Sequence, residues 1–389
     1  MAVKCEICGF EAHYLNDHLS EVHSMTEATY QVAYPNAPTM SVELKDRWEK
    51  QLSKAKRAGV STLTDIRYNF AGVSAKINPD VPEVACLPLP PHYKIPTCGD
   101  LGKDLEHAAI SLATKRSMYV WGLPGSGKDA LFHAWSNWTR TPALIFQVQP
   151  GVDIQSWFFS RSFDATGTQW EEGELLQALR DGYKSPISGR VIPYMILISD
   201  FDRADRAQAE SMRLVMDSIS GRVKGPGGAT YPVLAGTQIV VTANSAGAGD
   251  TRGRCISSNP LDASILDRFE RKYQFHWMDW KDEEVIVKAK FPNLTQQHGS
   301  AFDIAGKITY ALRTAIAKDE IYAEFSHRAL CCWLGHAEDL LQFRPNLATA
   351  ALLKKAARAF LDGMPDDETR QACVKLMDPH MPKGMLNED

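Results

Sequence analysis

Long apolar runs are missing from this sequence of 389 residues, and so is an excess of charge of either sign. No run approaches the ~18 apolar residues of a membrane helix, and the N-terminal MAVKCEICGFEAH has no apolar signal core. The 43 Lys and Arg against 47 Asp and Glu leave a net charge of −4, so any surface for nucleic acid must be local. Eight cysteines are too few for a disulfide framework in so long a chain. These absences argue against a membrane-spanning or disulfide-stapled secreted protein and favour a cytoplasmic globular one.

The cysteines that are present include one close pair near the N-terminus. In CEICGFEAHYLNDHLSEVH the spacing is C-x₂-C-x₉-H-x₄-H, which offers two thiolates at a turn and two imidazoles from one helix. Such a set predicts a tetrahedral Zn²⁺ site. The predicted ligands are Cys5, Cys8, His18 and His23, whereas His13 falls inside the loop. The alternative is a reduced cysteine pair beside unrelated histidines, but a module of fewer than ~30 residues needs a metal to hold a core.

Together with MTEATYQVAYPNAP, which begins two residues after His23, this module resembles the bacterial Ros/MucR-type finger, in which HMT-x-x-x-Y similarly follows the last histidine. Ros-type fingers bind DNA, yet Lys4 is the only Lys or Arg among residues 1–30. The same stretch holds five acidic residues, namely Glu6, Glu11, Asp17, Glu21 and Glu27. Because tracking a phosphate backbone requires several cations, we favour docking of a protein partner, with DNA as the alternative.

Composition and periodicity divide the chain into four segments. Residues 1–40 form the zinc-finger-like module, and residues 41–99 combine a helix at 41–59 with a proline-rich strap. Residues 100–278 alternate helical patterns with the short apolar runs MYVWG, ALIFQVQ, PYMILIS and TQIVVTAN, which is typical of parallel strands buried on both faces. Residues 279–389 are predicted to form a helical lid and a tail. The predicted fold class is α/β.

The stretch GLPGSGKD lies between an apolar run and a helical pattern, and it predicts a phosphate-binding loop. Glycines let backbone amides approach phosphate oxygens, while the helix N-terminus and the lysine supply positive charge. The alternative is a glycine turn before an ordinary helix. The hydroxyl residue that usually follows the lysine and ligates Mg²⁺ is replaced by Asp129. The predicted nucleotide-binding residues are Gly122, Leu123, Pro124, Gly125, Ser126, Gly127, Lys128, Asp129 and, from a later strand, Ser199.

Five motifs in this order resemble AAA+ ATPases of the MoxR branch, most closely the CobS-like family. They are GLPGSGKD, ILISDFDRA, TANSAGAGDTRG, ILDRFER and FSHRAL, and the resemblance spans roughly residues 60–360. It implies an AAA+ core with parallel sheet and helical lid, with ATP and Mg²⁺ as cofactors. The roles it implies are Asp200 as the base that polarises water, Asn244 as sensor, Arg268 as the finger toward a neighbouring subunit, and Arg328 as lid sensor. Arg252, Arg254 and Arg271 compete for the finger role, and a surface ion pair is the alternative for each arginine.

The metal site departs from the family pattern. Ser199 stands where the family has its metal-holding Asp, and Asp129 stands where it has a hydroxyl. We interpret the pair as a reciprocal exchange that keeps one carboxylate and one neutral oxygen, so the Mg²⁺ candidates are Asp129, Ser199 and Asp200. Loss by chance is the alternative. In a rival register Asp200 is the metal acid, Phe201 occupies the catalytic position, and hydrolysis is slow or absent.

Two further segments lie where the MoxR branch carries characteristic segments. Residues 151–179 stand where MoxR relatives carry an insert, and its aromatic residues are predicted either to form a pore or partner surface or to pack locally. They are Trp157, Phe158, Phe159 and Phe163. Residues 221–236 are predicted to form a hairpin with a mobile glycine tip.

The predicted function is ATP-driven remodelling of a partner protein by a homo-oligomeric, hexameric ring. The resemblance suggests a VWA-type client, as in MoxR and CobS systems. One alternative is an ATP-dependent assembly switch with little hydrolysis, and another is a DNA-associated motor recruited through the finger. Chelatase activity is not expected, because the finger and the altered metal site depart from CobS. A role in phage or mobile-element biology is suggested by analogy alone.

Overall fold

The computed structural model describes residues 3–12, 15–23, 30, 33–34, 37–39, 67–164, 167–213, 221–249 and 258–381. The chain forms two compact units, Met1–Ile66 and Arg67–Asp389. The predicted helix at 41–59 lies outside the described residues, as do His13, Arg252 and Arg254. In the described part, no helix has the length and apolar content needed to cross a membrane.

The N-terminal unit is built on a short hairpin and one helix. Strands β1 (Val3–Lys4) and β2 (Glu11–Ala12) pair antiparallel, and helix α1 spans Asn16–His23. Among the described residues of this unit, the buried hydrophobic side chains are those of Val3, Cys5, Leu15, Leu19 and Tyr30. A cluster of this size is small for a free-standing core, so a metal is expected to contribute to its stability.

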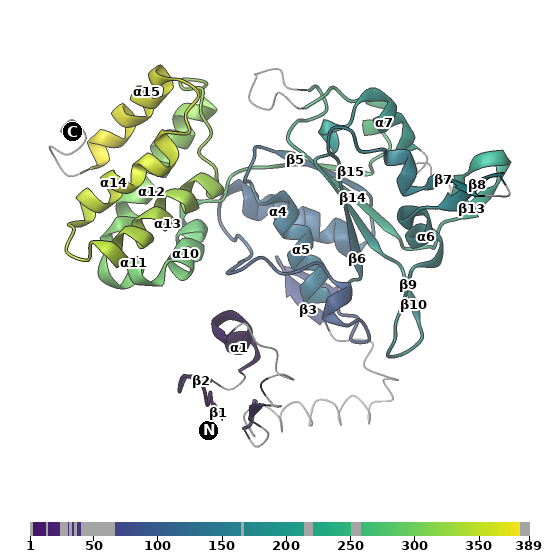
Figure 1. The fold of residues 1–389 in the computed structure, drawn as a ribbon, viewed down its shortest axis with the longest axis horizontal. Coiled ribbons are helices and arrows are strands. Elements are labelled where there is room, and N and C mark those ends of the chain that lie inside the picture. Colours follow the sequence, from purple (N-terminus) through teal and green to yellow (C-terminus); the bar gives the residue numbers. More distant parts are fainter. Residues whose placement is uncertain are drawn as a thin grey trace. The chain divides into compact units, whose positions relative to one another are not determined.

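The second unit contains a parallel sheet of five strands (Figure 1). The strands are β5 (Met118–Gly122), β6 (Ala143–Gln147), β11 (Met195–Ser199), β14 (Gln238–Ala243) and β15 (Arg271–Phe275). Their order across the sheet is β15-β5-β14-β11-β6, with all four pairings parallel. In chain order this is 5-1-4-3-2, so every connection between neighbouring strands is a crossover. The predicted α/β fold class is therefore confirmed.

Helices cover both faces of this sheet. On one face α4 (Gly99–Ala113) and α5 (Lys128–Thr139) pack with the hairpin of β3 (Arg67–Phe70) and β4 (Val73–Lys76). The other face is covered by α6 (Glu174–Asp181), α7 (Arg206–Ser211) and α9 (Ala263–Leu266). The β3–β4 hairpin was not expected within the strap. Phe70 is fully buried there, with its ring centroid 5.3 Å from that of Trp135, so the core begins near residue 67.

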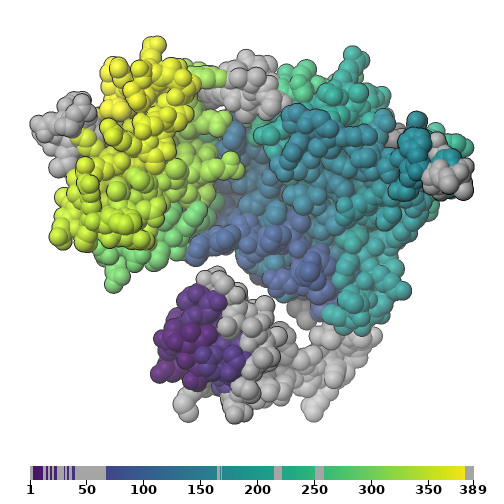
Figure 2. Space-filling model, in the orientation of Figure 1, coloured from purple at the N-terminus to yellow at the C-terminus, as the bar shows by residue number. Residues whose placement is uncertain are grey.

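Hairpins project from the edge of the core opposite the lid (Figures 1 and 2). β7 (Phe159–Asp164) pairs with β8 (Gly167–Glu172), and β12 (Arg222–Lys224) pairs with β13 (Thr230–Pro232). The second pair confirms the hairpin predicted at 221–236. Phe158 is buried, and Trp157 and Phe159 pack on other aromatic rings, whereas Phe163 is 78% exposed. Most of the predicted aromatic cluster therefore packs locally.

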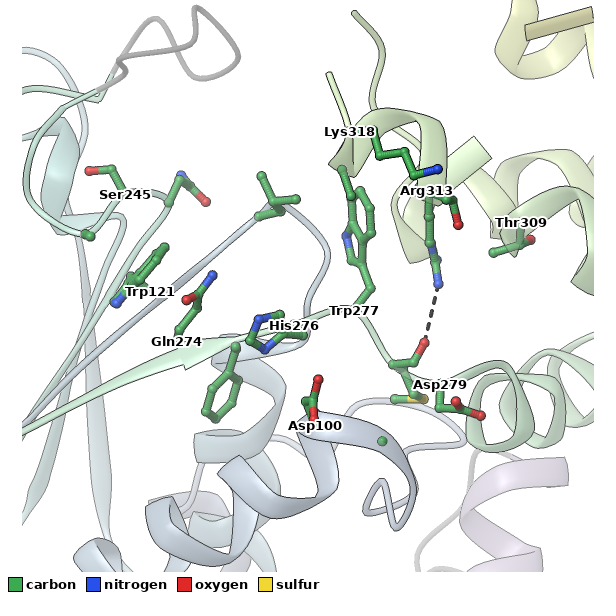
Figure 3. Close-up of a pocket in the computed structure, with 18 of the residues that line it drawn as sticks. Asp100, Trp121, Ser245, Gln274, His276, Trp277, Asp279, Thr309, Arg313 and Lys318 are labelled. Atoms are coloured by element: carbon green, nitrogen blue, oxygen red, sulfur yellow. Dashed lines mark hydrogen bonds between the residues drawn. The ribbon is translucent and has the colours of Figure 1, made fainter. Parts of the chain in front are cut away.

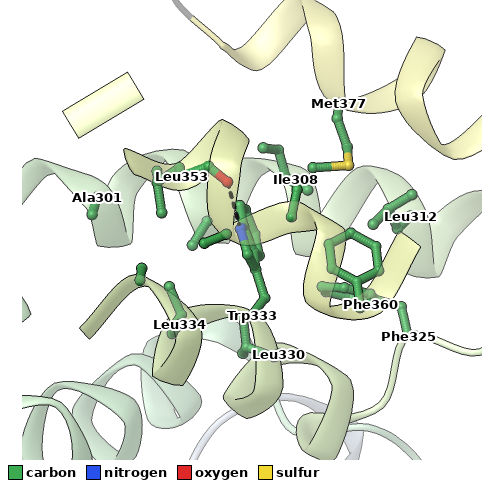
Figure 4. Packing of buried hydrophobic residues seen from close by; sticks show 14 of the residues in the cluster. Ala301, Ile308, Leu312, Phe325, Leu330, Trp333, Leu334, Leu353, Phe360 and Met377 are labelled. Carbon is green, nitrogen blue, oxygen red and sulfur yellow. Dashed lines mark hydrogen bonds between the residues drawn. The ribbon is translucent and has the colours of Figure 1, made fainter. Parts of the chain in front are cut away.

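The C-terminal part is helical, as predicted. Its helices are α10 (Trp280–Lys290), α11 (Pro292–Gln297), α12 (Ser300–Ala317), α13 (His327–Phe343), α14 (Thr349–Leu361) and α15 (Asp367–Met377). Figure 4 shows Trp333 at the centre of their shared core, where its indole N–H donates to the Leu353 carbonyl at 2.9 Å. A buried indole with a satisfied N–H contributes a large apolar area at no polar cost.

Candidate nucleotide site and metal centre

The phosphate loop, residues 122–128, needs glycine at defined positions. Gly127 has a φ of +81° at the N-cap of α5, and no side chain caps the helix there, which leaves first-turn amides open to a ligand. A Cβ at Gly122 would lie 2.2 Å from the Phe275 carbonyl oxygen. This turn therefore has the shape that suits backbone binding of phosphate.

Lys128 lies folded into the loop. Its side-chain amino group donates to the carbonyl oxygens of Gly122 at 2.7 Å and Leu123 at 3.3 Å. Its third hydrogen bond, at 3.1 Å, goes to the side-chain oxygen Oδ1 of Asn244, the residue directly after β14. Lys128 is mostly buried, so its charge is held where a phosphate oxygen would replace these neutral acceptors.

Asp200 completes this group at the carboxyl end of β11. Its φ of +56° turns the chain sharply out of the strand. The carboxylate is within 3.5 Å of Asn244 Nδ2, 3.4 Å of Gln147 Nε2 and 3.8 Å of Arg203 Nε. The structure thus brings together the predicted residues Lys128, Asn244 and Asp200, because they follow β5, β14 and β11, which are neighbours in the sheet.

Asp129 contacts a residue that the sequence analysis missed. Thr242, buried on β14, donates a hydrogen bond to Asp129 Oδ1 at 2.7 Å. Ile198 pairs with Val241 in the sheet, so Ser199 and Thr242 are the next residues along these two strands. The Ser199 hydroxyl is buried and makes no hydrogen bond within the described part of the chain. A buried hydroxyl oxygen without a hydrogen-bond partner is a donor type that a hard cation accepts.

Asp202 is a second missed residue, and it shapes the sensor turn. Its side chain is fully buried, and Oδ2 accepts from the backbone amides of Asn244 at 3.0 Å and Ser245 at 3.1 Å. The Ser258 hydroxyl donates to the same oxygen. These bonds fix the backbone that presents Asn244 to Lys128. The sequence shows an acidic residue two positions after Asp200, and this was the signal by which Asp202 could have been found. Its role could not be predicted from that signal, because its partners lie more than 40 residues away in the sequence.

A cleft of about 940 Å³ opens between the loop, the linker after β15 and α12, a size typical of small-molecule sites. Trp277 in the linker donates its indole N–H to the Pro124 carbonyl of the loop at 3.2 Å. Arg313 of α12 lies over the Trp277 ring at 5.2 Å (Figure 3). The cleft is therefore bounded by groups that connect the loop to the lid. Trp277 and Arg313 lie outside the motifs of the sequence analysis, so they were not predicted.

The start of α13 packs directly on the phosphate loop. A Cβ at Gly125 would lie 2.6 Å from the Cβ of Ser326, the residue that caps α13. Arg328 is exposed in the first turn of this helix, two residues from that contact. Arg268 is half-buried in the turn between α9 and β15, and Arg271 begins β15 with its side chain exposed. The roles of these arginines remain predictions.

An ion network holds the lid beside the cleft. Glu283 is buried, and its carboxylate accepts two hydrogen bonds from Arg313, at 2.6 and 2.9 Å. Burial disfavours its charged form, but hydrogen bonds and charge from His327 and Arg313 lower the pKa of Glu283 overall. Its negative charge therefore stays fixed at neutral pH.

The four predicted zinc ligands converge in the N-terminal unit. Their ligand atoms all lie within 4.8 Å of one another. Cys8 Sγ is 3.1 Å from His18 Nε2 and 3.3 Å from His23 Nε2, and Cys5 Sγ is 3.5 Å from His23 Nε2. Bond lengths of ~2.3 Å to sulfur and ~2.0 Å to nitrogen place ligands of a tetrahedral zinc at separations of this size. The donor set and spacing fit Zn²⁺.

Comparisons with known proteins found similarity to solved structures alone. No family model and no curated protein matches the chain. Among solved structures, a RuvB mutant of Thermotoga maritima is similar at 15% identity and a TM-score of 0.43, covering 69% of this chain and 71% of that one. NtrX of Brucella abortus in complex with ADP is similar at 12% identity and a TM-score of 0.46, covering 74% and 61% respectively. Similarities this low do not by themselves assign a family or a function.

Proposed function

We propose that this chain is an AAA+ ATPase of the MoxR branch that binds ATP with Mg²⁺ and hydrolyses it. The contact of Lys128 with Asn244, beside Asp200 at the neighbouring strand end, carries this proposal. In the proposed site the loop amides and Lys128 hold the phosphates, and Asp129 with Ser199 holds the metal that neutralises their charge. Asn244 orients the attacking water, and Asp200 accepts its proton.

The first test is binding of a fluorescent ATP analogue to the full-length chain with Mg²⁺. Lys128→Ala should abolish saturable binding. Among the described residues, Lys128 is the cation whose side chain bonds to the loop, and its charge would be lost. Lys375→Ala, an exposed lysine on α15, is the matched control and should bind as the natural chain does. Equal binding by both variants would refute nucleotide binding at this loop.

The second test separates hydrolysis from binding. Asp200→Asn keeps the shape of the side chain and removes the base, so it should retain ATP while turnover falls by about 10²-fold or more. Asp367→Asn, at an exposed position on α15, is the control. If the natural chain binds ATP and forms rings without turnover, the assembly-switch function replaces hydrolysis.

The ring is proposed to act on a partner protein, with the zinc module as the docking element. Lys4 is the single described cation near the four zinc ligands, so binding to duplex DNA should be weak and lost at modest salt. Tight binding to DNA at physiological salt would instead support a DNA-associated motor. Cross-linking of the Asp200→Asn protein in its native host, with and without residues 1–40, should reveal a client that requires the module.

A further inference from the structure

Cys331 faces a histidine that the proposed nucleotide chemistry does not use. Its Sγ lies 3.3 Å from His327 Nε2, one turn earlier on α13. Residues four apart share one helix face, which is why these two side chains meet. The other ring nitrogen, Nδ1, lies 2.8 Å from Glu283 Oε1. A thiol, an imidazole and a carboxylate thus form a hydrogen-bonded series, the arrangement that activates cysteine nucleophiles.

The carboxylate end of this series is held rigidly. The Glu283 side chain is 1% exposed and bound by both terminal nitrogens of Arg313. A fixed carboxylate on Nδ1 orients the ring so that Nε2 points to the sulfur, and it favours the protonated imidazole. Burial opposes protonation, yet the hydrogen bonds to Cys331 and Glu283 raise the pKa of His327 to about 9.

The surroundings of Cys331 favour its thiolate form, and the residue is partly exposed. Burial raises the pKa of Cys331, but the hydrogen bond and charge of His327, with a smaller effect of Lys290, lower it overall. Lys290 comes from the end of α10, while Glu283 and Arg313 lie behind the imidazole. Cys331 is partly exposed, so a small reagent can reach its sulfur.

We propose that Cys331 is an activated thiol, a modification site for hydroperoxides and other small soft electrophiles, with His327 as its proton donor. With a hydroperoxide, the sulfur attacks one peroxide oxygen, and an S–O bond forms as the O–O bond breaks. The sulfur is oxidised by two electrons and the peroxide is reduced. The departing oxyanion takes the proton from His327 Nε2, which leaves a sulfenic acid, a neutral imidazole and an alcohol or water.

The test measures alkylation of the full-length chain by iodoacetamide across pH, with mass spectrometry of the modified peptide. In this step an S–C bond forms and iodide leaves. Cys332 is the matched control, because it is adjacent and exposed but donates only a weak hydrogen bond to the Ala359 carbonyl at 3.5 Å. Cys332→Ser and Cys331→Ser proteins report on each thiol alone. Cys331 should react about three- to tenfold faster than Cys332 at pH 7, since only the thiolate reacts and a lower pKa partly reduces its nucleophilicity.

His327→Gln should slow Cys331 to the rate of Cys332 and leave Cys332 unchanged. Thermal unfolding checks that this variant is folded, and if it is not, the pH profile of the natural chain decides. Dimedone, which traps sulfenic acids, should label residue 331 after treatment with cumene hydroperoxide, and the Cys331→Ser protein should lack that label. Coincident pH profiles for the two thiols, or an unchanged Cys331 rate in folded His327→Gln protein, would overturn the proposal.

Discussion

Asp129 shows how a single substitution is accommodated by its neighbours. A carboxylate at this position would be costly if it were buried without a partner. Here its oxygen accepts the Thr242 hydroxyl proton, and the orphaned Ser199 hydroxyl occupies the next strand. The charge is therefore stabilised by a neutral hydroxyl donor, and a second hydroxyl lies on the strand next to that donor. This arrangement is consistent with an exchange of roles at the proposed metal site.

If Asp129 and Ser199 have exchanged roles, their substitutions must be energetically coupled. Asp129→Thr leaves two neutral oxygens at the exchanged positions and should weaken Mg²⁺-dependent ATP hydrolysis severely. Ser199→Asp places two carboxylates near the triphosphate and should weaken nucleotide binding through repulsion. The double variant should recover activity by ~1–3 kcal/mol relative to additivity. Steady-state kinetics of the four proteins measure this coupling, and strictly additive losses would show that the exchange is coincidental.

Two glycines of the phosphate loop differ in one testable respect. Gly125 and Gly127 have φ values of +71° and +81°, so alanine strains the backbone at both positions. A Cβ at Gly125 would also lie 2.6 Å from the Ser326 Cβ, whereas nothing lies within 4 Å of one at Gly127. Gly125→Ala should therefore lower the free energy of unfolding by about 1–3 kcal/mol more than Gly127→Ala does. Urea denaturation without nucleotide measures the difference, and equal losses would mean that the α13 cap does not press on the loop in solution.

Among the elements, the zinc module depends most on its ligands, because its described core is small. Purified protein should contain about one Zn²⁺ per chain. Cys8→Ser removes one of two thiolates and should release the metal and unfold the module, while the α/β core keeps its melting temperature. Cys98→Ser, at the N-cap of α4, changes a thiol outside the site and should retain full zinc. Metal analysis and thermal unfolding provide the measurements, and zinc-free protein prepared without chelator would rule out the site.

The whole molecule is proposed to work as a ring in which Arg268 completes a neighbour's site. ATP should then favour a hexamer, measurable by light scattering, and Arg268→Ala should reduce hydrolysis about 10³-fold with little loss of nucleotide affinity. Mixing supplies a sharper measurement. Lys128→Ala subunits still carry the finger, and Arg268→Ala subunits still carry the loop, so mixed rings should regain part of the activity that each variant lacks. No recovery in rings shown to be mixed would assign the finger elsewhere, with Arg271 next to be tested.

Features formed by neighbouring residues were open to prediction from the sequence. The glycine loop with its lysine, the zinc ligand spacing, the four short buried strands and the lid helices all depend on local spacing and period. The β3–β4 hairpin was missed, because its strands are only four residues long and each buries a single side chain, Phe70 or Ala75, against the core.

The connections between these features depend on which strands become neighbours. Asp202 meets the Asn244 amide across 42 positions, and Thr242 meets Asp129 across 113, because β14 lies between β5 and β11. Trp277 contacts the loop at Pro124, and Arg313, which Glu283 holds, stacks on Trp277 from the lid. The local chemistry of each motif is specified by a few adjacent residues, since backbone conformation responds to immediate neighbours. Which distant residues become partners depends on the order of the strands in the sheet. That order is decided by the folded structure as a whole, because it is the order that buries the core cooperatively.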